Sequence, residues 1–200
     1  MLLDAGADVF AVEPNDAMRT SAEVELSRWS NFRSVKGTAK ATGLPKGSVS
    51  LITSAQAFHW FDSIASREEF RRIMKVGSWC ALIWNTMNLG TSEFGIGYEQ
   101  IKKVFGSERG RVRHKDIENS GRLDTLFSAG NWRKHVFENS QKLDLKGLKG
   151  RLLSSSYSPK EGHPRHKPMI AALETLFHRC QRDGFIQIEY TTDLFLGRLA

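Results

Sequence analysis

The sequence predicts an α/β protein built around a parallel sheet. In the first half of the chain, short β-rich runs alternate with amphipathic stretches, and this order is typical of strands that are connected by helices. One run, residues 79–84, is apolar throughout, as a strand covered on both faces should be. The 200 residues are 40% hydrophobic and 26% charged, so the chain can bury a sizeable core.

The first strands and the first helix follow from local sequence patterns. Strands are predicted at residues 8–13, 32–36 and 48–54. Pro14 ends the first strand, and either Asn15 or Asp16 can cap the helix that comes after it.

A second helix and a buried strand come next. Residues 67–74 carry apolar side chains on one side and charged side chains, among them Glu69, on the other, which predicts an amphipathic helix. Gly77 stands where a helix C-cap glycine belongs. Residues 79–84 then form the apolar strand, and Asn85 opens a loop after it.

The second half of the chain differs in character. Helices are predicted at residues 98–105, 123–129 and 168–182, and strands at residues 132–143 and 185–196. Residues 109–121 are polar and predict a mobile connection. Because no internal repeat or low-complexity linker interrupts the chain, residues 1–200 are expected to form a single domain.

Composition and charge argue against several classes of protein. The net charge of +7 could suggest a nucleic-acid partner, but the basic residues are scattered, and the densest stretch, residues 109–115, has no interleaved aromatics. No apolar run approaches the roughly 18 residues of a membrane span, and the first residues do not resemble a signal peptide. Cys80 lies in an apolar run, which predicts a buried reduced thiol. We therefore expect a cytoplasmic protein without disulfides, nucleic-acid partner or membrane contact.

Candidate ligand-binding groups follow three of the predicted strands, where open α/β sheets bind their ligands. Glu13 ends the first strand, where a carboxylate can accept hydrogen bonds from ribose hydroxyls; alternatively, it is a solvent-facing residue before a proline turn. Gly37, Thr38 and Ala39 follow the second strand and are small enough for a flat adenine ring to approach the backbone. A glycine at this position can also be a simple turn residue.

The segment at residues 54–62 is the most informative. It follows a strand and places a glutamine, a histidine and aromatic side chains at the mouth of a predicted pocket. An apolar stretch that contains a histidine is often only a structural element, but the position at a strand end favours contact with a ligand.

These motifs resemble successive motifs of class I S-adenosylmethionine-dependent methyltransferases of the methyltransferase type 11 group. The matching segments, in order, are residues 12–18, 37–39, 54–62, 70–77, 81–85, 150–159 and 197–199. The resemblance implies a Rossmann-like sheet with helices on both faces and a C-terminal antiparallel strand. It further implies that residues 1–88 form the cofactor-binding part and residues 89–200 the acceptor-side part.

The resemblance also implies where the cofactor, S-adenosyl-L-methionine, lies. The residues expected to bind it are Glu13, Pro14, Asn15, Met18, Thr38, Ala39, Ser54, Ala55 and Gln56. Glu13 matches the residue that holds the ribose hydroxyls. Residues 14–18 and 38–39 match the two sides of the adenine site, and residues 54–56 match the segment under the methionine part.

The methyl acceptor implied by the resemblance is a small molecule, and no metal ion is expected. By their positions, His59, Trp60 and Tyr157 would face it. His59 is the candidate general base if the acceptor is a hydroxyl or an amine. Most of the acceleration of a methyl transfer can come from aligning donor and acceptor, so an obligatory catalytic residue need not exist.

One departure from the family is large. Nothing like Gly-x-Gly-x-Gly occurs before Glu13, although the family places the amino-acid end of the cofactor on such a loop. Residues 1–7 resemble only the last turn of the helix that follows this loop. We therefore expect a truncated domain that lacks roughly 30 residues or more, including the first strand. In the family, that strand lies between those that end at Glu13 and Ser54.

Three explanations of this truncation are open: a reading frame taken from an internal Met, a gene fragment, or a chain that is completed by a partner segment. Each uncompensated backbone group at an unpaired strand edge costs about 1–3 kcal/mol, so the activity of this chain is itself in question. Two other functions remain. The first is a non-catalytic binding protein or fragment of the same fold. The second is a nicotinamide-dependent oxidoreductase, against which the His-Trp-Phe segment speaks.

Overall fold

The computed structural model describes residues 1–107, 118, 120–155 and 157–199. The strands are β1 (Val9–Val12), β2 (Phe32–Val35), β3 (Val49–Ala55), β4 (Met74–Asn88), β5 (Trp132–Leu143) and β6 (Ile186–Gly197). The helices are α1 (Asp16–Glu25), α2 (Ser63–Ile73), α3 (Glu93–Phe105), α5 (Arg122–Phe127), α6 (Leu145–Leu153) and α7 (His166–Cys180), together with the 3₁₀ turn η1 (Phe58–Trp60).

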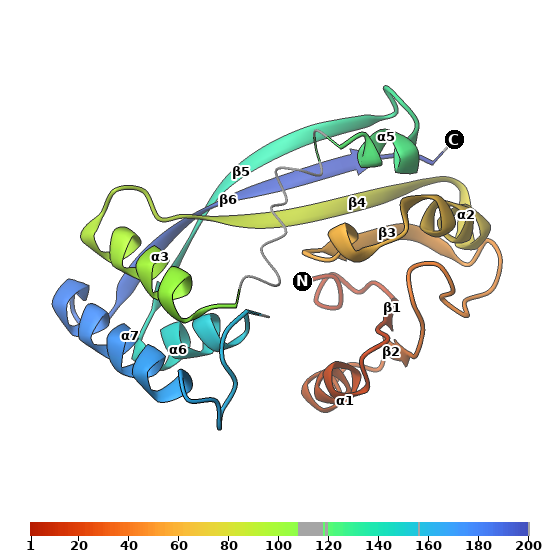
Figure 1. Cartoon of the computed structure of the whole chain (residues 1–200). Helices are drawn as coiled ribbons and strands as arrows, with labels where there is room; N and C mark the ends of the chain where they lie inside the picture. Colours follow the sequence, from red (N-terminus) through yellow and green to blue (C-terminus); the bar gives the residue numbers. More distant parts are fainter. Residues whose placement is uncertain (108–117, 119, 156, 200) are drawn as a thin grey trace. The chain divides into compact units, whose positions relative to one another are not determined.

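The strands belong to two sheets. β1 and β2 pair in parallel, in register from Val9 opposite Phe32 to Val12 opposite Val35. The other sheet has the order β3-β4-β6-β5, and β5 and β6 run in opposite directions in it (Figure 1). Parallel and antiparallel pairs with intervening helices confirm the predicted α/β class. The expectation that a first strand is missing from this chain stays a prediction.

Two predicted boundaries in the first half are wrong. α2 begins at Ser63, because Asp62 caps it by accepting hydrogen bonds from the amides of Ile64 and Ala65, both at 3.1 Å. The helix ends at Ile73, so Gly77 is no C-cap; it lies inside β4 with a φ of +78°.

β4 also continues past the predicted loop at Asn85 and ends at Asn88. Its central position explains the length, since β3 lies on one side of it and β6 on the other. The sequence pattern missed this extension because three of the four residues after Trp84 are polar, and polar side chains are acceptable in a strand whose backbone groups are paired.

Among the described residues, the second half follows the predicted order and adds the helix α6. Its two glycines weaken the helical signal, but Asp144 caps its first turn, and Leu148 and Leu152 are fully buried. The predicted connection at residues 109–121 lies mostly outside the described residues.

The chain divides into two compact units. The first contains Met1–Leu82, Lys115–Lys134 and Phe195–Ala200; the second contains Ile83–His114 and His135–Leu194. In the first unit α2 packs on α5. The buried apolar side chains of this unit include Phe58, Phe70, Ile73, Cys80, Leu82, Leu123, Leu126, Phe127 and Phe195. The predicted single domain, with its cofactor-binding and acceptor-side parts, stays a prediction.

The core of the second unit lies around the contact between α3 and α7. Its buried members are Phe94, Tyr98, Ile101, Leu148, Leu152, Met169, Leu173, Leu176, Phe177, Ile186, Ile188 and Tyr190. Gly97 permits the two helices to approach, because a Cβ atom at this position would lie 2.6 Å from Cδ1 of Leu176. Burial raises the pKa of one phenol of this core, that of Tyr98, above its ordinary value.

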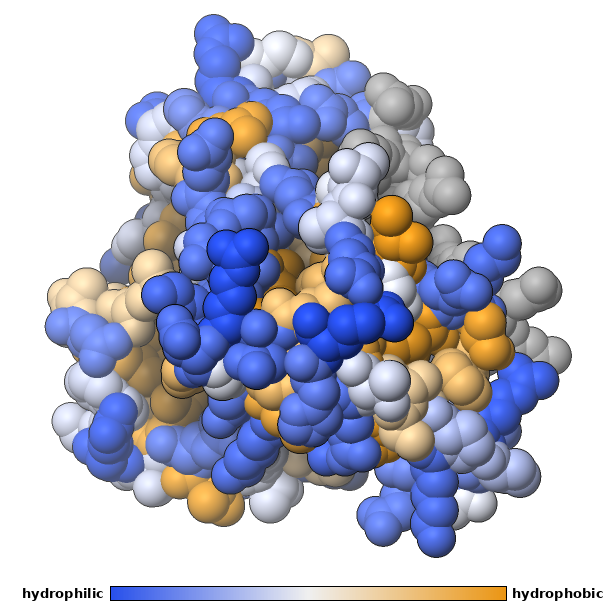
Figure 2. Space-filling model, turned by 90° about the vertical axis from the view of Figure 1, so that its left-hand side faces the viewer, coloured by the Kyte–Doolittle hydropathy of each residue, from blue (hydrophilic) through white to orange (hydrophobic). Residues whose placement is uncertain are grey.

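Cys80 is buried and free, as predicted, and burial raises the pKa of its thiol to about 12. Hydrophilic side chains cover most of the face that Figure 2 shows, with hydrophobic groups between them. No helix among the described residues combines the length and the apolar character that a membrane span needs.

Candidate functional site

Glu13 lies directly after β1, at the turn that leads into α1. Its amide donates to the carbonyl oxygen of Val35 at 3.1 Å, which continues the pairing with β2 by one residue. The half-buried carboxylate accepts a hydrogen bond from the amide of Asn15 at 2.8 Å, and Asn15 in turn caps α1 through the amide of Met18 at 3.1 Å. The backbone turn therefore holds Glu13 at the sheet end, where Pro14, Asn15 and Met18 are exposed.

The backbone after β2 passes very close to its neighbours at Gly37. A Cβ atom here would lie 2.9 Å from the carbonyl oxygen of Thr42 and 3.0 Å from both the carbonyl oxygen of Ala41 and Cγ1 of Val12. Thr38 then pairs with Ala41 through two backbone hydrogen bonds of 3.0 and 3.1 Å. Close approach is thus the reason for glycine at this position. Since β1 and β2 are parallel and in register, Glu13 and the predicted residues Thr38 and Ala39 follow the same end of this sheet.

The end of β3 carries a buried polar group and an unusual backbone conformation. Ser54 is only 7% exposed, and its hydroxyl oxygen has no hydrogen-bond partner among the described residues. Two residues later, Gln56 has a φ of +55°, a left-handed conformation that non-glycine residues seldom adopt. Such strain often accompanies binding sites, and a buried hydroxyl without a partner calls for a ligand or water. Ala55 and Gln56 are exposed.

His59 and Trp60 belong to the turn η1, which aromatic side chains anchor from within. Phe58 is fully buried, and its ring meets that of Phe61 edge to face at 5.8 Å; Phe61 meets Phe70 of α2 in the same way at 6.3 Å. The rings of His59 and Trp60 lie 4.9 Å apart. Trp60 is 66% exposed, whereas His59 is half-buried and its Nδ1 is shielded from solvent.

Arg122, the first residue of α5, contacts this turn and was not predicted as a site residue. Its guanidinium donates to the carbonyl oxygens of Phe58, His59 and Phe61, and to the hydroxyl of Ser63. No sequence signal identifies it, because it lies 59 to 64 positions after its partners, in a polar stretch of ordinary composition.

Glu69 was predicted on the charged side of its helix, and this is wrong: it is 9% exposed and carries a buried network. It accepts hydrogen bonds from the amide and the hydroxyl of Thr42, and Arg72 pairs with it at 2.7 Å. Arg72 beside Glu69, together with the bonds from Thr42, lowers the pKa of this carboxyl to about 2 despite its burial. The network fastens the loop after residues 37–39 to α2.

Tyr157 lies in the second unit, whereas His59 and Trp60 lie in the first. It is half-buried, and its carbonyl oxygen accepts a hydrogen bond from the amide of Ser107 at 3.0 Å. That these three residues face one acceptor stays a prediction.

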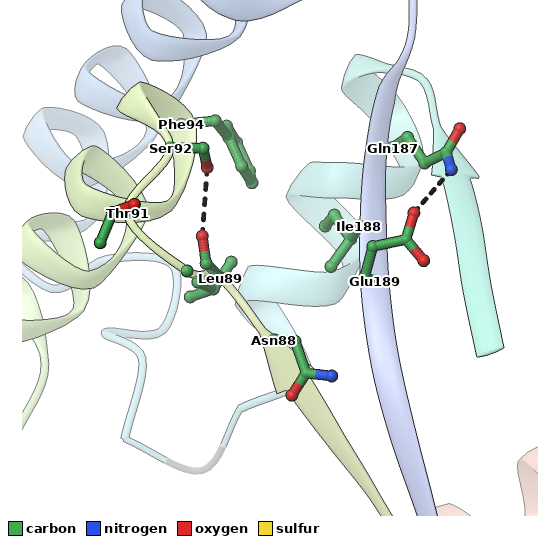
Figure 3. Close-up of a pocket in the computed structure, with 9 residues that line it drawn as sticks. Asn88, Leu89, Thr91, Ser92, Phe94, Gln187, Ile188 and Glu189 are labelled. Atoms are coloured by element: carbon green, nitrogen blue, oxygen red, sulfur yellow. Dashed lines mark hydrogen bonds between the residues drawn. The ribbon is translucent and has the colours of Figure 1, made fainter. Parts of the chain in front are cut away.

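The second unit also contains a pocket of about 340 Å³ between the loop after β4 and strand β6 (Figure 3). The lining residues are Asn88, Leu89, Gly90, Thr91, Ser92, Phe94, Gln187, Ile188 and Glu189. Three polar side chains at its wall donate to protein groups: Asn88 donates to Thr191, Ser92 to the carbonyl oxygen of Leu89, and Gln187 to Glu189. None of the predicted site residues lines this pocket.

Comparison with known proteins relates the first part of the chain to methyltransferases. Residues 1–82 match the family described as a methyltransferase domain. An uncharacterised methyltransferase of Mycobacterium tuberculosis is 33% identical over 85 residues, which are 42% of this chain and 34% of that protein. An uncharacterised methyltransferase-like protein of Schizosaccharomyces pombe is 30% identical over 87 residues, 44% of this chain and 32% of the relative. The chain thus spans about a third of the length of the curated relatives it matches.

Solved structures resemble nearly the whole chain. A protein of Anaeromyxobacter dehalogenans, assigned as a type II methyltransferase, superposes with a TM-score of 0.63 at 20% identity, over 95% of this chain and 80% of its own. A protein of Anabaena variabilis, assigned as a methyltransferase of an antibiotic biosynthesis pathway, gives a TM-score of 0.56 at 19% identity, over 99% of this chain and 84% of its own. These similarities show a common Rossmann-like fold.

Proposed function

We propose that this chain transfers a methyl group from S-adenosyl-L-methionine to a small-molecule acceptor, because residues 1–82 match the methyltransferase domain family and the chain has the Rossmann-like fold of methyltransferases. The observation that carries the proposal is the end of β3, where the buried hydroxyl of Ser54 lacks a partner among the described residues and Gln56 is strained. Ligands of open α/β sheets bind at such strand ends.

The residues at the three strand ends fit the chemical groups of the cofactor. Glu13 offers carboxylate oxygens, which accept hydrogen bonds from vicinal hydroxyls of a ribose. The close packing around Gly37 holds Thr38 and Ala39 at the same sheet end as Glu13, and we assign these two small residues to the adenine ring. The hydroxyl of Ser54 and the polar groups of the exposed residues Ala55 and Gln56 are suited to an amino-acid moiety. We assign the remaining residues of the site, Pro14, Asn15 and Met18, to the adenine side, where they are exposed.

When bound, S-adenosyl-L-methionine supplies a methyl group that its positively charged sulfonium activates for displacement. The protein has then to place an acceptor atom and to remove its proton. Trp60 presents an exposed indole against which an apolar acceptor can pack, and His59 stands beside it. We assign the role of general base to His59 for an acceptor that is a hydroxyl or an amine.

Isothermal titration calorimetry with S-adenosylhomocysteine tests the cofactor part of the proposal on the intact chain. We expect saturable heat with one binding site per chain. Circular dichroism first establishes that the sample is folded, and a parallel titration uses NAD. A folded chain that gives no heat with S-adenosylhomocysteine would contradict the proposal, and heat with NAD alone would replace the proposal with the oxidoreductase function.

A further inference from the structure

The carbonyl oxygens of the turn at Phe58–Phe61 converge on one guanidinium group. Nη1 of Arg122 donates to the carbonyl oxygen of His59 at 3.1 Å, and Nη2 donates to those of Phe58, at 3.3 Å, and of Phe61. Nε donates to the hydroxyl of Ser63 at 3.1 Å. The same guanidinium lies over the ring of Phe58, 5.2 Å from its centroid.

A short 3₁₀ turn leaves most of its carbonyl groups without partners inside the turn. In η1, the amide of Trp60 donates to Ala57 and the amide of Phe61 donates to Phe58, whereas the carbonyl of His59 accepts from Arg122. Arg122 donates hydrogen bonds to these carbonyl groups from a rigid planar fork, which fixes their direction. A lysine at the same position would keep the charge but offers only a single nitrogen.

The position of Arg122 is itself fixed by the burial of its helix. In α5, the three side chains Leu123, Leu126 and Phe127 are at most 1% exposed. The helix packs on α2, and Arg67 of α2 donates to the hydroxyl of Ser128, just past the end of α5, at 2.8 Å. Arg122 therefore connects an anchored helix to the turn, and the turn cannot rotate without breaking several hydrogen bonds.

We propose that Arg122 is a positioning residue, which sets the orientation of His59 and Trp60 by holding the carbonyl groups of the turn that carries them. The inference deepens the proposed function, since it rests on these two side chains facing the methyl acceptor. The part played by Arg122 is to hold the backbone, and it takes no part in the transfer of the methyl group or the proton.

Fluorine NMR of the intact chain, labelled with 5-fluorotryptophan, reads the orientation of Trp60 without any ligand. Comparison with Trp60→Phe assigns the Trp60 resonance among the five tryptophans. In Arg122→Lys and Arg122→Ala we expect this resonance to shift or broaden, while the resonance of Trp29 in the same unit keeps its position. Arg71→Lys, an exposed arginine of α2, is the matched control and should leave all five resonances in place.

A purely structural role of Arg122 would lower stability without moving the Trp60 resonance of the folded protein. A Trp60 resonance that is unchanged in folded Arg122→Lys therefore overturns the inference. If Arg122→Ala does not fold, the comparison is made with Arg122→Lys alone. Titration of S-adenosylhomocysteine into the same samples separates the two proposals. Absence of heat in the unmodified chain counts against the proposed function. The Trp60 resonance alone tests whether Arg122 sets the orientation of Trp60.

Discussion

At the scale of single residues, two glutamates show how environment assigns different tasks to one side chain. Glu69 is buried and has all its bonds within the protein, to Thr42 and Arg72. Glu13 is half-buried at a strand end, where the amide of Asn15 occupies one of its oxygens. The hydrogen bonds of Glu69 stabilise the loop that contains Thr42. Glu13 is the residue that we propose as a ligand-binding group.

Glu69 should make the stability of the protein depend on acidic pH. Its pKa is lowered from 4.5 to about 2, so its contribution is fully present above pH 4.5 and is lost as the pH falls toward 2. Glu69→Gln should reduce the free energy of unfolding by about 2 kcal/mol at pH 7. Urea denaturation between pH 2 and 7 should give a shallower loss for this variant than for the unmodified chain. Glu68→Gln, an exposed neighbour, should behave as the unmodified chain does; an unaltered pH dependence in Glu69→Gln would refute the assignment.

Glu13→Gln tests the cofactor site with little disturbance of the turn. Glutamine keeps an oxygen that can accept from the amide of Asn15 but loses the charge and the second acceptor. We expect the Kd for S-adenosylhomocysteine to rise by about tenfold, or roughly 1.4 kcal/mol. Calorimetry on Glu25→Gln, an exposed residue of α1, provides the matched comparison. Equal affinities in the two variants would remove Glu13 from the site.

At the scale of elements, close contacts hold the strand ends and leave little space for larger side chains. β2 ends at Val35. At Gly37, two residues later, two backbone oxygens and a valine side chain lie about 3 Å from the position that a Cβ atom would occupy. The adjoining loop is fastened to α2 by Thr42 and Glu69. The position of Thr38 and Ala39 therefore depends on α2 as well as on the strand before them.

Gly37→Ala should destabilise the protein more than a glycine-to-alanine substitution at an uncrowded position does. The new Cβ would meet the carbonyl oxygens of Ala41 and Thr42, which are backbone atoms and cannot move aside cheaply. We expect a loss of about 1–3 kcal/mol in the free energy of unfolding, measured by urea denaturation, and weaker binding of S-adenosylhomocysteine. Gly150→Ala in α6 has open space around it and should be neutral or stabilising. Equal stability of the two variants would show that the close approach does not matter.

At the scale of the whole molecule, burial is distributed unevenly. α1 buries no residue, and β1 and β2 have none in the buried class, whereas α7 alone buries Met169, Leu173, Leu176 and Phe177. Segments with few buried apolar contacts open at a low free energy. The residues assigned to the cofactor at the end of β1 thus belong to a part of the chain that should open at a low free energy.

Hydrogen exchange measured by mass spectrometry should reveal this difference. Amides of residues 9–35 should exchange faster than those of α7 and β6. S-adenosylhomocysteine should slow the exchange at residues 13–18, 37–39 and 54–56 and leave α7 unchanged. Uniform exchange along the chain would contradict the first expectation, and a protection pattern elsewhere would contradict the second.

Much of the fold could be predicted because its signals are local. The strand before Glu13, the cap at Asn15 and the amphipathic pattern of α7 each depend on residues within a few positions of one another. The errors arose where a partner distant in the sequence decides. β4 runs on to Asn88 because β3 and β6 pair with it, and α6 forms because Leu148 and Leu152 can be buried.

The sequence by itself determined the α/β order and the placement of Glu13, residues 37–39 and residues 54–56 at the ends of strands. Periodicity and turn residues suffice for this, since they act over one or two turns of chain. Only the tertiary structure decided that Glu69 is buried and that Arg122 holds the turn of His59. Their polar side chains would suit a solvent-exposed surface equally well, and it is the groups brought to them by folding, up to 64 positions away, that give them their roles.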